Sequence, residues 1–302
     1  MKNFLRRILP YSVLTKLLDL STKVNEILAN IKIALSLPLK RKPKQLILDI
    51  HIAEHCNLNC CGCGHFSPLA EPELYDVDEF KRDMERTGEL FGHECEEIRL
   101  MGGEPLFHPE IITLMKVARD NFPKGKICIV SNGILLPQQK DEFWQACHDN
   151  DIEVSVTRYP IHLDEEKINK MAEKFDVKFQ WFLNPNVKHF LYKKPIDLSG
   201  NGDCKKNFAM CIWAGGRCAE LLHGKIYMCQ FIPNVRHFNK RFGQNIPVTD
   251  ADYIDIYQEG MDKDTIFQKL TEPVPICRFC DIKGVQGGIE WRVSKGIMDE
   301  WV

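Results

Sequence analysis

Residues 51–65 read HIAEHCNLNCCGCGH, and they place Cys56, Cys60 and Cys63 in a C-x3-C-x2-C pattern. Cubane iron–sulfur clusters are held by cysteine thiolates, and four is the usual number of ligands. Three cysteines leave one iron without a protein ligand, and that iron is free to bind a small molecule. The stretch therefore predicts a [4Fe–4S] cluster with one open iron.

Zinc is the alternative for this stretch, because short cysteine spacings also build structural zinc sites. Zinc requires a fourth ligand, and three histidines lie close by in the sequence: His51, His55 and His65. Cys61 interrupts the cysteine run, and we interpret it as a bystander.

A second motif lies in the segment EEIRLMGGEP at 96–105. Its apolar part predicts a strand at 98–101 that ends in Gly102, Gly103 and Glu104. Glycine lets the backbone approach a ligand without a clash from a Cβ atom. The carboxylate of Glu104 can accept hydrogen bonds from an ammonium group. Alone this motif is an ordinary turn, but its position after the cysteine run gives it weight.

Together the two motifs resemble those of radical S-adenosylmethionine (radical SAM) enzymes. In that family the open iron chelates the amino and carboxylate groups of S-adenosylmethionine. One electron from the cluster then cleaves the cofactor to methionine and a 5′-deoxyadenosyl radical. The resemblance implies that Cys56, Cys60 and Cys63 are the catalytic cluster ligands. It also implies a set of cofactor-binding residues at the ends of two strands and within a third: Gly102, Gly103, Glu104, Ser131, Asn132 and Ser155.

One position departs from the family pattern. The family usually has an aromatic residue just before the third cysteine, where its ring helps to hold the adenine, and this chain has Gly62 there. His65 and Phe66 are the candidates to replace that ring.

Composition limits the class of protein. The chain has 302 residues, of which 44% are hydrophobic and 27% charged, with a net charge of −2. These values describe a soluble globular protein and give no argument for nucleic-acid binding. The 13 cysteines are an odd number, and no cleavable signal peptide is evident. Metal binding in a reducing cytoplasm is therefore favoured over a disulfide scaffold, and no apolar run predicts a spanning helix.

Residues 1–45 differ in character from the rest of the chain. They hold ten Lys or Arg residues against Asp19 and Glu26, so their net charge is +8 (10 − 2). Apolar residues at helical spacing, punctuated by Pro10 and Pro38, predict a short helix and then a longer one. Three interpretations of this basic extension stay open: packing on the barrel, binding to the inner membrane face, and docking on a partner.

Strands and helices alternate through the next part of the chain. We predict strands at 46–55, 98–101, 126–130, 152–157 and 177–182, and helices at 78–90, 109–121, 138–149 and 164–174. This alternation predicts an α/β fold with a parallel sheet. The resemblance implies a partial (βα)6 TIM-like barrel. The predicted domains are an N-terminal helical extension at 1–45, the radical SAM barrel at 46–200 and a cysteine-rich domain at 201–302, with a long loop at 184–203.

A second group of cysteines follows residue 200. Cys211, Gly224 and Cys229 precede a distant C-x2-C pair, Cys277 and Cys280. This pattern resembles the twitch domain, a shortened SPASM extension, and implies one auxiliary [4Fe–4S] cluster held by those four cysteines. The segment HGKIYMCQF at 223–231 resembles its hairpin, with Gly224 at the bend. Cys218 competes with Cys211 for the first place, and zinc remains the alternative metal.

The other cysteines are outside both patterns: Cys61, Cys95, Cys128, Cys147, Cys204 and Cys218. Cys95, Cys128 and Cys147 are predicted bystanders, with Cys128 in the core. Cys204 and Cys218 are candidate hydrogen-atom donors to a substrate radical.

The resemblance indicates the chemistry better than the substrate. The first hypothesis is oxidation or epimerisation of a sugar-like or cyclitol-like small molecule, with the auxiliary cluster accepting an electron. Arg158 and His162 are the candidates to take a hydroxyl proton, and Arg158 is also a candidate for the cofactor carboxylate or a surface salt bridge. The alternatives are a peptide or protein maturase of the SPASM type and a non-catalytic iron–sulfur protein. An external electron donor of the flavodoxin or ferredoxin type is expected. Glu290 and Arg292 either line a substrate cavity or finish the fold.

Overall fold

The computed structural model describes residues 45–302 apart from 93–94, 183–189 and 215–217, and for 190–192 it describes only the backbone. The predicted extension at 1–45 therefore lies outside the described residues, except for its last residue. Residues 42–302 form one compact unit, which contains both groups of cysteines.

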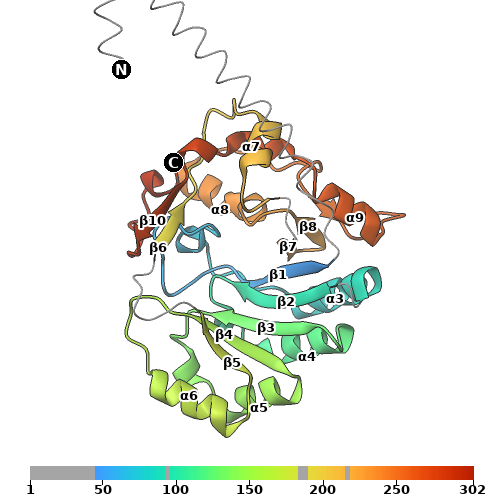
Figure 1. Ribbon diagram of the computed structural model, residues 1–302, viewed down its shortest axis with the longest axis vertical. Helices are drawn as coiled ribbons and strands as arrows, with labels where there is room; N and C mark the ends of the chain where they lie inside the picture. Colours follow the sequence, from blue (N-terminus) through green and yellow to red (C-terminus); the bar gives the residue numbers. More distant parts are fainter. Residues whose placement is uncertain (1–44, 93–94, 183–189, 215–217) are drawn as a thin grey trace, which may run out of the picture. The chain divides into compact units, whose positions relative to one another are not determined.

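An eight-stranded sheet in the order β5-β4-β3-β2-β1-β7-β8-β9 forms the centre of this unit (Figure 1). Its strands are β1 (Leu46–Ala53), β2 (Cys95–Gly102), β3 (Lys126–Ser131), β4 (Ile152–Thr157), β5 (Phe179–Phe182), β7 (Cys218–Leu222), β8 (Lys225–Tyr227) and β9 (Ile254–Asp255). Six neighbouring strands of this sheet are parallel to one another: β5, β4, β3, β2, β1 and β7. At the edge beyond them, β8 pairs antiparallel with β7, and β9 pairs antiparallel with β8. The predicted α/β fold with a partial barrel of parallel strands is confirmed.

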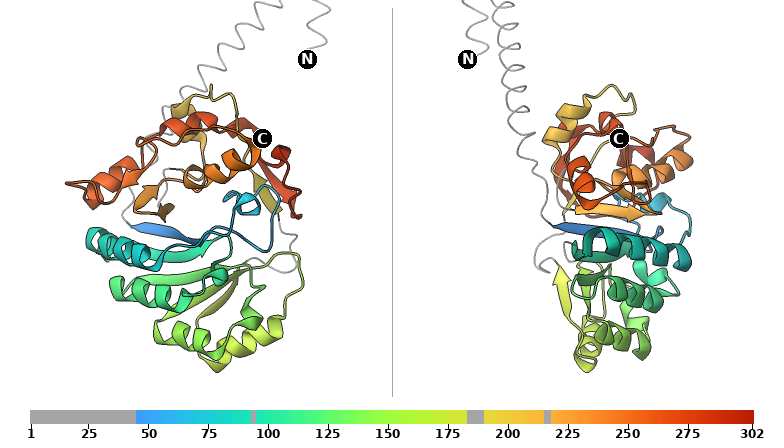
Figure 2. Two further views of the ribbon diagram at one scale, coloured as in Figure 1. Left: turned by 180° about the vertical axis from the view of Figure 1, so that it is seen from behind. Right: turned by 90° about the vertical axis from the view of Figure 1, so that its right-hand side faces the viewer.

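Four helices connect the first five strands and lie together on one side of the sheet (Figures 1 and 2). They are α3 (Val77–Phe91), α4 (Ile111–Asn121), α5 (Asp141–Asp149) and α6 (Glu165–Lys174). Asp76 begins α3 because its side chain accepts the Glu79 amide at 2.9 Å, and Asp164 begins α6 by accepting the Lys167 amide at 3.0 Å. Apolar residues of these helices, such as Phe80 and Leu114, are buried against the strands.

The opposite face of the sheet is polar. Asp49 of β1 pairs in register with Arg99 of β2, Arg99 with Cys128 of β3, and Cys128 with Glu153 of β4. Directly paired residues point to the same face of a sheet, so these four side chains form one row across it. The inside of the open barrel is therefore lined by charged and hydrogen-bonding groups.

The C-terminal part of the chain joins the same sheet. The sixth parallel strand, β7, pairs with β1, so it lies on the far side of β1 from β5. The hairpin predicted at Gly224 is present between β7 and β8, and Gly224 has the positive φ of 67° that such a turn favours. The sheet is continuous across residue 200, where we predicted a domain boundary, and that boundary stays a prediction.

The remaining elements cover the end of the sheet beyond β1 (Figures 1 and 2). They are α7 (Cys204–Met210), α8 (Phe231–Phe242), α9 (Lys263–Lys269), β6 (Phe190–Lys193) and β10 (Gln286–Glu290). The prediction of an irregular loop at 184–203 is wrong for β6, which pairs antiparallel with β10. Its partner strand lies far away in the sequence, so no local sequence pattern predicts the pairing.

Candidate functional site

A pocket of about 170 Å³ lies at the C-terminal ends of the parallel strands. Cys56, Cys60 and Cys63 line it on one side. Its other walls come from the ends of β2, β3 and β4 and from the segments that follow them: Met101, Gly102, Gly103, Val130, Ser131, Asn132, Thr157 and Tyr159. The structure thus brings together the three predicted cluster ligands and four of the six predicted cofactor-binding residues.

The thiols of this pocket are partly buried, and two of them receive hydrogen bonds. The Leu58 amide and Asn132 Nδ2 each approach Cys56 Sγ at 3.5 Å, and Trp291 Nε1 donates to Cys60 Sγ at 3.0 Å. Burial raises the pKa of Cys56 to about 11 and that of Cys60 to about 12. All three thiols line one pocket, and N–H groups approach two of them, as they do the sulfur ligands of a cluster. The donor set therefore fits an iron–sulfur cluster.

The C-terminal segment closes over the cysteine loop. The Cys61 amide donates to the Arg292 carbonyl at 2.9 Å, and the Ser294 amide donates to the Asn59 carbonyl at 2.7 Å. Trp301 Nε1 donates to the Cys63 carbonyl at 2.9 Å. Of the two C-terminal residues singled out in the sequence, Arg292 pairs with Glu300 at 2.8 Å and finishes the fold. The contacts from Trp291 and Trp301 had no recognisable sequence signal.

The glycines of the second motif line the cysteine pocket and also make a close backbone contact. A Cβ on Gly102 would lie 2.2 Å from the Ala53 carbonyl oxygen, and a Cβ on Gly103 would lie 2.1 Å from the His55 carbonyl oxygen. The Gly103 amide donates to Ala53 at 2.7 Å, and the Glu104 amide donates to His55 at 2.9 Å. The glycines therefore allow the end of β2 to lie against the start of the cysteine loop.

Glu104 lies behind the pocket and is 0% exposed. Its carboxylate accepts hydrogen bonds from Ser131 Oγ at 2.7 Å, the Asn132 amide at 2.9 Å and the Leu106 amide at 3.3 Å. Burial raises the pKa of Glu104 to about 7, although these bonds oppose the shift. Glu104 thus ties the end of β2 to the end of β3, and its contact with a cofactor ammonium group stays a prediction.

Ser155 faces a different cavity. This cavity of about 310 Å³ lies on the polar face of the sheet, and Ser155 Oγ there accepts Gln180 Nε2 at 3.1 Å. Residues from all five strands β1 to β5 complete its lining: Asp49, Glu97, Arg99, Lys126, Cys128, Thr157 and Phe182. It shares Met101, Val130 and Thr157 with the cysteine pocket, so the two spaces adjoin.

Three other residues singled out in the sequence have defined surroundings. Arg158 pairs with Glu165 at 2.8 Å and stacks over Trp181 at 4.5 Å, which supports the salt-bridge interpretation. Phe66 packs in the core against Phe238, with ring centroids 5.8 Å apart. His65 lines the cysteine pocket. Of the two candidates to replace the missing aromatic ring, only His65 faces that pocket.

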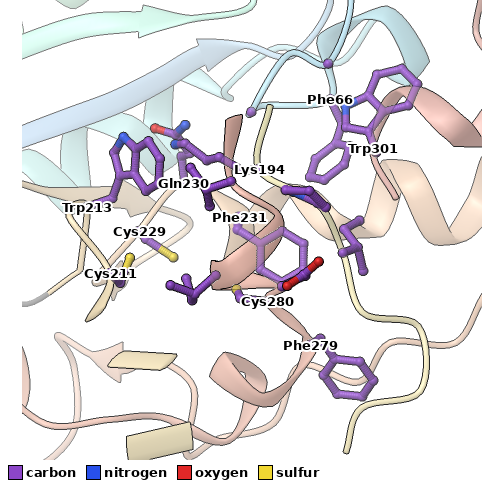
Figure 3. Close-up of a pocket in the computed structure, with 17 residues that line it drawn as sticks. Phe66, Lys194, Cys211, Trp213, Cys229, Gln230, Phe231, Phe279, Cys280 and Trp301 are labelled. Atoms are coloured by element: carbon purple, nitrogen blue, oxygen red, sulfur yellow. The ribbon is translucent and has the colours of Figure 1, made fainter. Parts of the chain in front are cut away.

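The second group of cysteines also converges (Figure 3). Cys211, Cys229 and Cys280 line a cavity of about 60 Å³. Burial raises the pKa of Cys229 to about 12 and that of Cys277 to about 11, and charges on the other thiols of this group add to both shifts. Each of the four thiols interacts electrostatically with the other three. This sulfur-only donor set fits an iron–sulfur cluster or zinc.

Cys218 is separate from this group. It lies on β7, where its thiol donates to Asp49 Oδ2 at 3.1 Å on the polar face of the sheet. The Cys204 thiol donates to the Pro275 carbonyl at 3.4 Å, and its charge adds to the raised pKa of Cys277. The geometry thus favours Cys211 over Cys218 as the first residue of the second cysteine set.

A parallel α/β sheet that ends in a pocket with a C-x3-C-x2-C loop defines the radical SAM class of proteins. Residues 50–177 match the family model described as the Radical SAM superfamily. Residues 50–177 therefore form a radical SAM domain, and proteins of that family use a [4Fe–4S] cluster and S-adenosylmethionine. The twitch resemblance of the C-terminal part stays a prediction.

Among curated proteins, the chain is similar to several GTP 3′,8-cyclases, including those of two bacteria. It is 30% identical over 125 residues to that of Chlorobaculum tepidum (strain ATCC 49652 / DSM 12025 / NBRC 103806 / TLS), covering 41% of this chain and 36% of the relative. It is 29% identical over 129 residues to that of Clostridium perfringens (strain SM101 / Type A), covering 42% and 36%. The matched region spans little more than a third of these relatives.

Among solved structures, the chain is similar to BtrN in complex with AdoMet and 2-DOIA. The TM-score is 0.50 at 14% identity, and the match covers 78% of this chain and 93% of BtrN. At this identity the likeness shows a common fold. Within the part of the chain that the structure describes, no helix is long and apolar enough to cross a membrane.

Proposed function

We propose that this protein is a radical SAM oxidoreductase that oxidises or epimerises a small, hydroxyl-rich molecule of the sugar or cyclitol type. The observation that carries the proposal is the 310 Å³ cavity that adjoins the cysteine pocket. Its lining offers hydrogen-bond donors and acceptors close to the place where a radical would form. A polyol requires such a surface, because each buried hydroxyl group needs a partner.

The charged side chains that line this cavity are two acidic and two basic residues, and they pair with one another. Arg99 lies 3.5 Å from Asp49 and 3.0 Å from Glu97, and Lys126 lies 3.2 Å from both Glu97 and Glu153. A site for a nucleoside triphosphate requires an excess of positive charge. This self-paired network favours a neutral polyol instead. BtrN, which has the same fold, binds AdoMet together with the small molecule 2-DOIA.

We assign the cysteine pocket to the cofactors. Cys56, Cys60 and Cys63 hold the cluster, and Gly102, Gly103, Ser131 and Asn132 bind S-adenosylmethionine beside it. When bound, the cluster and S-adenosylmethionine supply a radical that abstracts a hydrogen atom from the substrate. Asn132 links the cysteine loop to the segment that follows β3. Its Nδ2 donates to Asn57 Oδ1 at 2.8 Å, and its Oδ1 accepts the Ile134 amide at 3.0 Å.

Asp49 replaces Arg158 and His162 as the candidate to take the hydroxyl proton. It lines the substrate cavity, and burial raises its pKa, which makes the carboxylate a better base. Arg158 is held by Glu165, and His162 is exposed. Oxidation of an alcohol to a ketone removes a C–H hydrogen atom, the hydroxyl proton and one further electron, so the proposal requires an electron acceptor.

The proposed acceptor is an auxiliary [4Fe–4S] cluster on Cys211, Cys229, Cys277 and Cys280. Gly62 and Gly64 of the core cysteine loop line the same 60 Å³ cavity as three of these cysteines, so the two cysteine groups are close neighbours. An external donor of the flavodoxin or ferredoxin type supplies the electron that starts the reaction. Cytoplasmic location, and contact of residues 1–45 with the inner membrane face or a protein partner, remain part of the proposal.

The test combines metal analysis with a substrate screen on anaerobically reconstituted protein. We expect about eight irons per chain, falling to about four in the Cys56/Cys60/Cys63→Ala variant. Neutral sugars and cyclitols, GTP and a peptide library are then incubated with S-adenosylmethionine and reductant. Oxidation appears as loss of two hydrogens, and epimerisation in D₂O appears as uptake of one deuterium. Consumption of GTP alone, or of peptides alone, would contradict the proposed substrate class.

A further inference from the structure

Lys194 lies between the two cysteine groups. It lines the 60 Å³ cavity together with Cys211, Cys229 and Cys280 of the second group and with Gly62 and Gly64 of the first. Figure 3 shows Lys194 beside Trp213. The ammonium nitrogen lies 3.8 Å from the centre of the Trp213 ring, and a cation above an aromatic face is attracted to it. The ring therefore holds the charge at the cavity.

The electrostatic environment of Lys194 includes both cysteine groups. Burial lowers its pKa, while the charges of Cys229, Cys211, Cys280 and Cys63 oppose that shift. Lys194 thus interacts with three thiols of the second group and one of the first. Among the described residues that line the cavity, it is the one cation, and Asp281, which accepts the Gly284 amide at 3.0 Å, is the one anion.

We propose that Lys194 is a positioning residue that raises the reduction potential of the auxiliary cluster. The inference rests on the proposed function, because it requires a cluster at the second cysteine group. Reduction of a cluster adds one negative charge, and a nearby ammonium group stabilises the reduced state. The same cation stabilises the oxidised state less. The auxiliary cluster thereby becomes a better acceptor for the one electron that substrate oxidation releases.

The position of Lys194 favours an effect on the potential of the auxiliary cluster over an effect on the core cluster. Three cysteines of the auxiliary set, Cys211, Cys229 and Cys280, line the cavity with Lys194, whereas the core cysteine loop contributes only Gly62 and Gly64 to that lining. The auxiliary cluster should therefore respond more strongly than the core cluster to removal of this charge. The electron that the substrate releases is then transferred to the auxiliary cluster rather than to the core cluster. The cluster that accepts this electron is thus different from the cluster that starts the reaction.

The experiment is a redox titration of the reconstituted full-length protein, followed by electron paramagnetic resonance. Lys194→Met keeps the length of the side chain but removes the charge, and Lys194→Arg keeps the charge. Lys193→Met is the matched control, because the Lys193 ammonium group donates to the Asp299 carbonyl at 2.7 Å and does not line the cavity. We expect Lys194→Met to lower the reduced-to-oxidised ratio of the auxiliary cluster at fixed potential about tenfold, about 59 mV for one electron.

The outcomes separate this inference from the proposed function. Wild-type potentials in Lys194→Arg and Lys193→Met, with a lowered auxiliary potential in Lys194→Met, support the role of Lys194. An intact auxiliary signal with an unchanged potential in Lys194→Met overturns it and leaves the proposed function standing. Absence of a second cluster signal in the wild type, with zinc in its place, overturns both.

Discussion

The indole Nε1 of Trp291 donates a hydrogen bond to the thiol of Cys60 at 3.0 Å. The two residues belong to opposite ends of the unit, since Cys60 lies just after β1 and Trp291 follows β10. A hydrogen bond to a thiolate stabilises the more negative state of a cluster and raises its reduction potential. The C-terminal segment therefore contributes to the chemistry of the first cysteine group as well as covering it.

Trp291→Phe should make the core cluster harder to reduce. A hydrogen bond to a charged group contributes about 1.5–3 kcal/mol, so its loss should lower the reduced-to-oxidised ratio by at least about tenfold. The measurement is a redox titration together with the rate of 5′-deoxyadenosine formation. Trp181→Phe is the control, because it removes an indole bond to Asn169 of 3.0 Å away from both cysteine groups. Equal potentials in the two variants would show that the Trp291 bond has no such effect.

Asp49→Asn should separate cofactor cleavage from product formation. Removal of a general base typically costs a factor of about 10²–10⁴, so product should fall at least about a hundredfold. Formation of 5′-deoxyadenosine should continue, because Asp49 does not line the cysteine pocket. Both products are measured by mass spectrometry in the same reaction. Asp141→Asn, which loses only an exposed ion pair with Lys174, serves as the control. If both products fell together in Asp49→Asn, Asp49 would not be the base.

Cys211→Ser and Cys218→Ser should differ in metal content. The first removes a thiol that lines the cavity of the second group, and the second removes a thiol bonded to Asp49 on the sheet. We expect iron to fall from about eight to about four per chain in Cys211→Ser and to stay near the wild-type value in Cys218→Ser. Iron and sulfide analysis measures this directly. The reverse pattern would assign the ligand position to Cys218.

Glu104→Gln should reduce the pH dependence of stability. The pKa of Glu104 in the folded state is raised to about 7 from 4.5, so its contribution is complete below pH 4.5 and is lost as the pH rises through 7. The free energy of unfolding from this group should fall by about 3 kcal/mol over that window. The glutamine variant cannot lose a proton there, so its stability curve should be flatter between about pH 5 and pH 8.

The measurement is urea unfolding of the cluster-free protein at a series of pH values in that range. Glu110→Gln, which changes an exposed carboxyl group on the same segment, is the control. A wild-type curve that runs parallel to the Glu104→Gln curve would show that Glu104 does not titrate with a raised pKa.

Sequence patterns were sufficient where function depends on residues close together in the chain. The C-x3-C-x2-C loop, the strand ends at Ser131 and Asn132, and the hairpin at Gly224 all carry local signals, and the structure places each as predicted. Glu104 and Ser155 show the limit of this approach. Both lie on predicted strands or turns, but the direction of each side chain depends on packing between elements, and neither lines the cysteine pocket.

By itself, the sequence determined the resemblance to radical SAM enzymes, the C-x3-C-x2-C loop and the alternation of strands and helices. These features arise from residue type and short spacing, which act through local geometry and metal chemistry. Only the tertiary structure decided that β7 lies beside β1, that Trp291 reaches Cys60, and that Lys194 lies between the cysteine groups. Such contacts join residues far apart in the chain, and they are selected by burial and pairing of whole elements rather than by any local pattern.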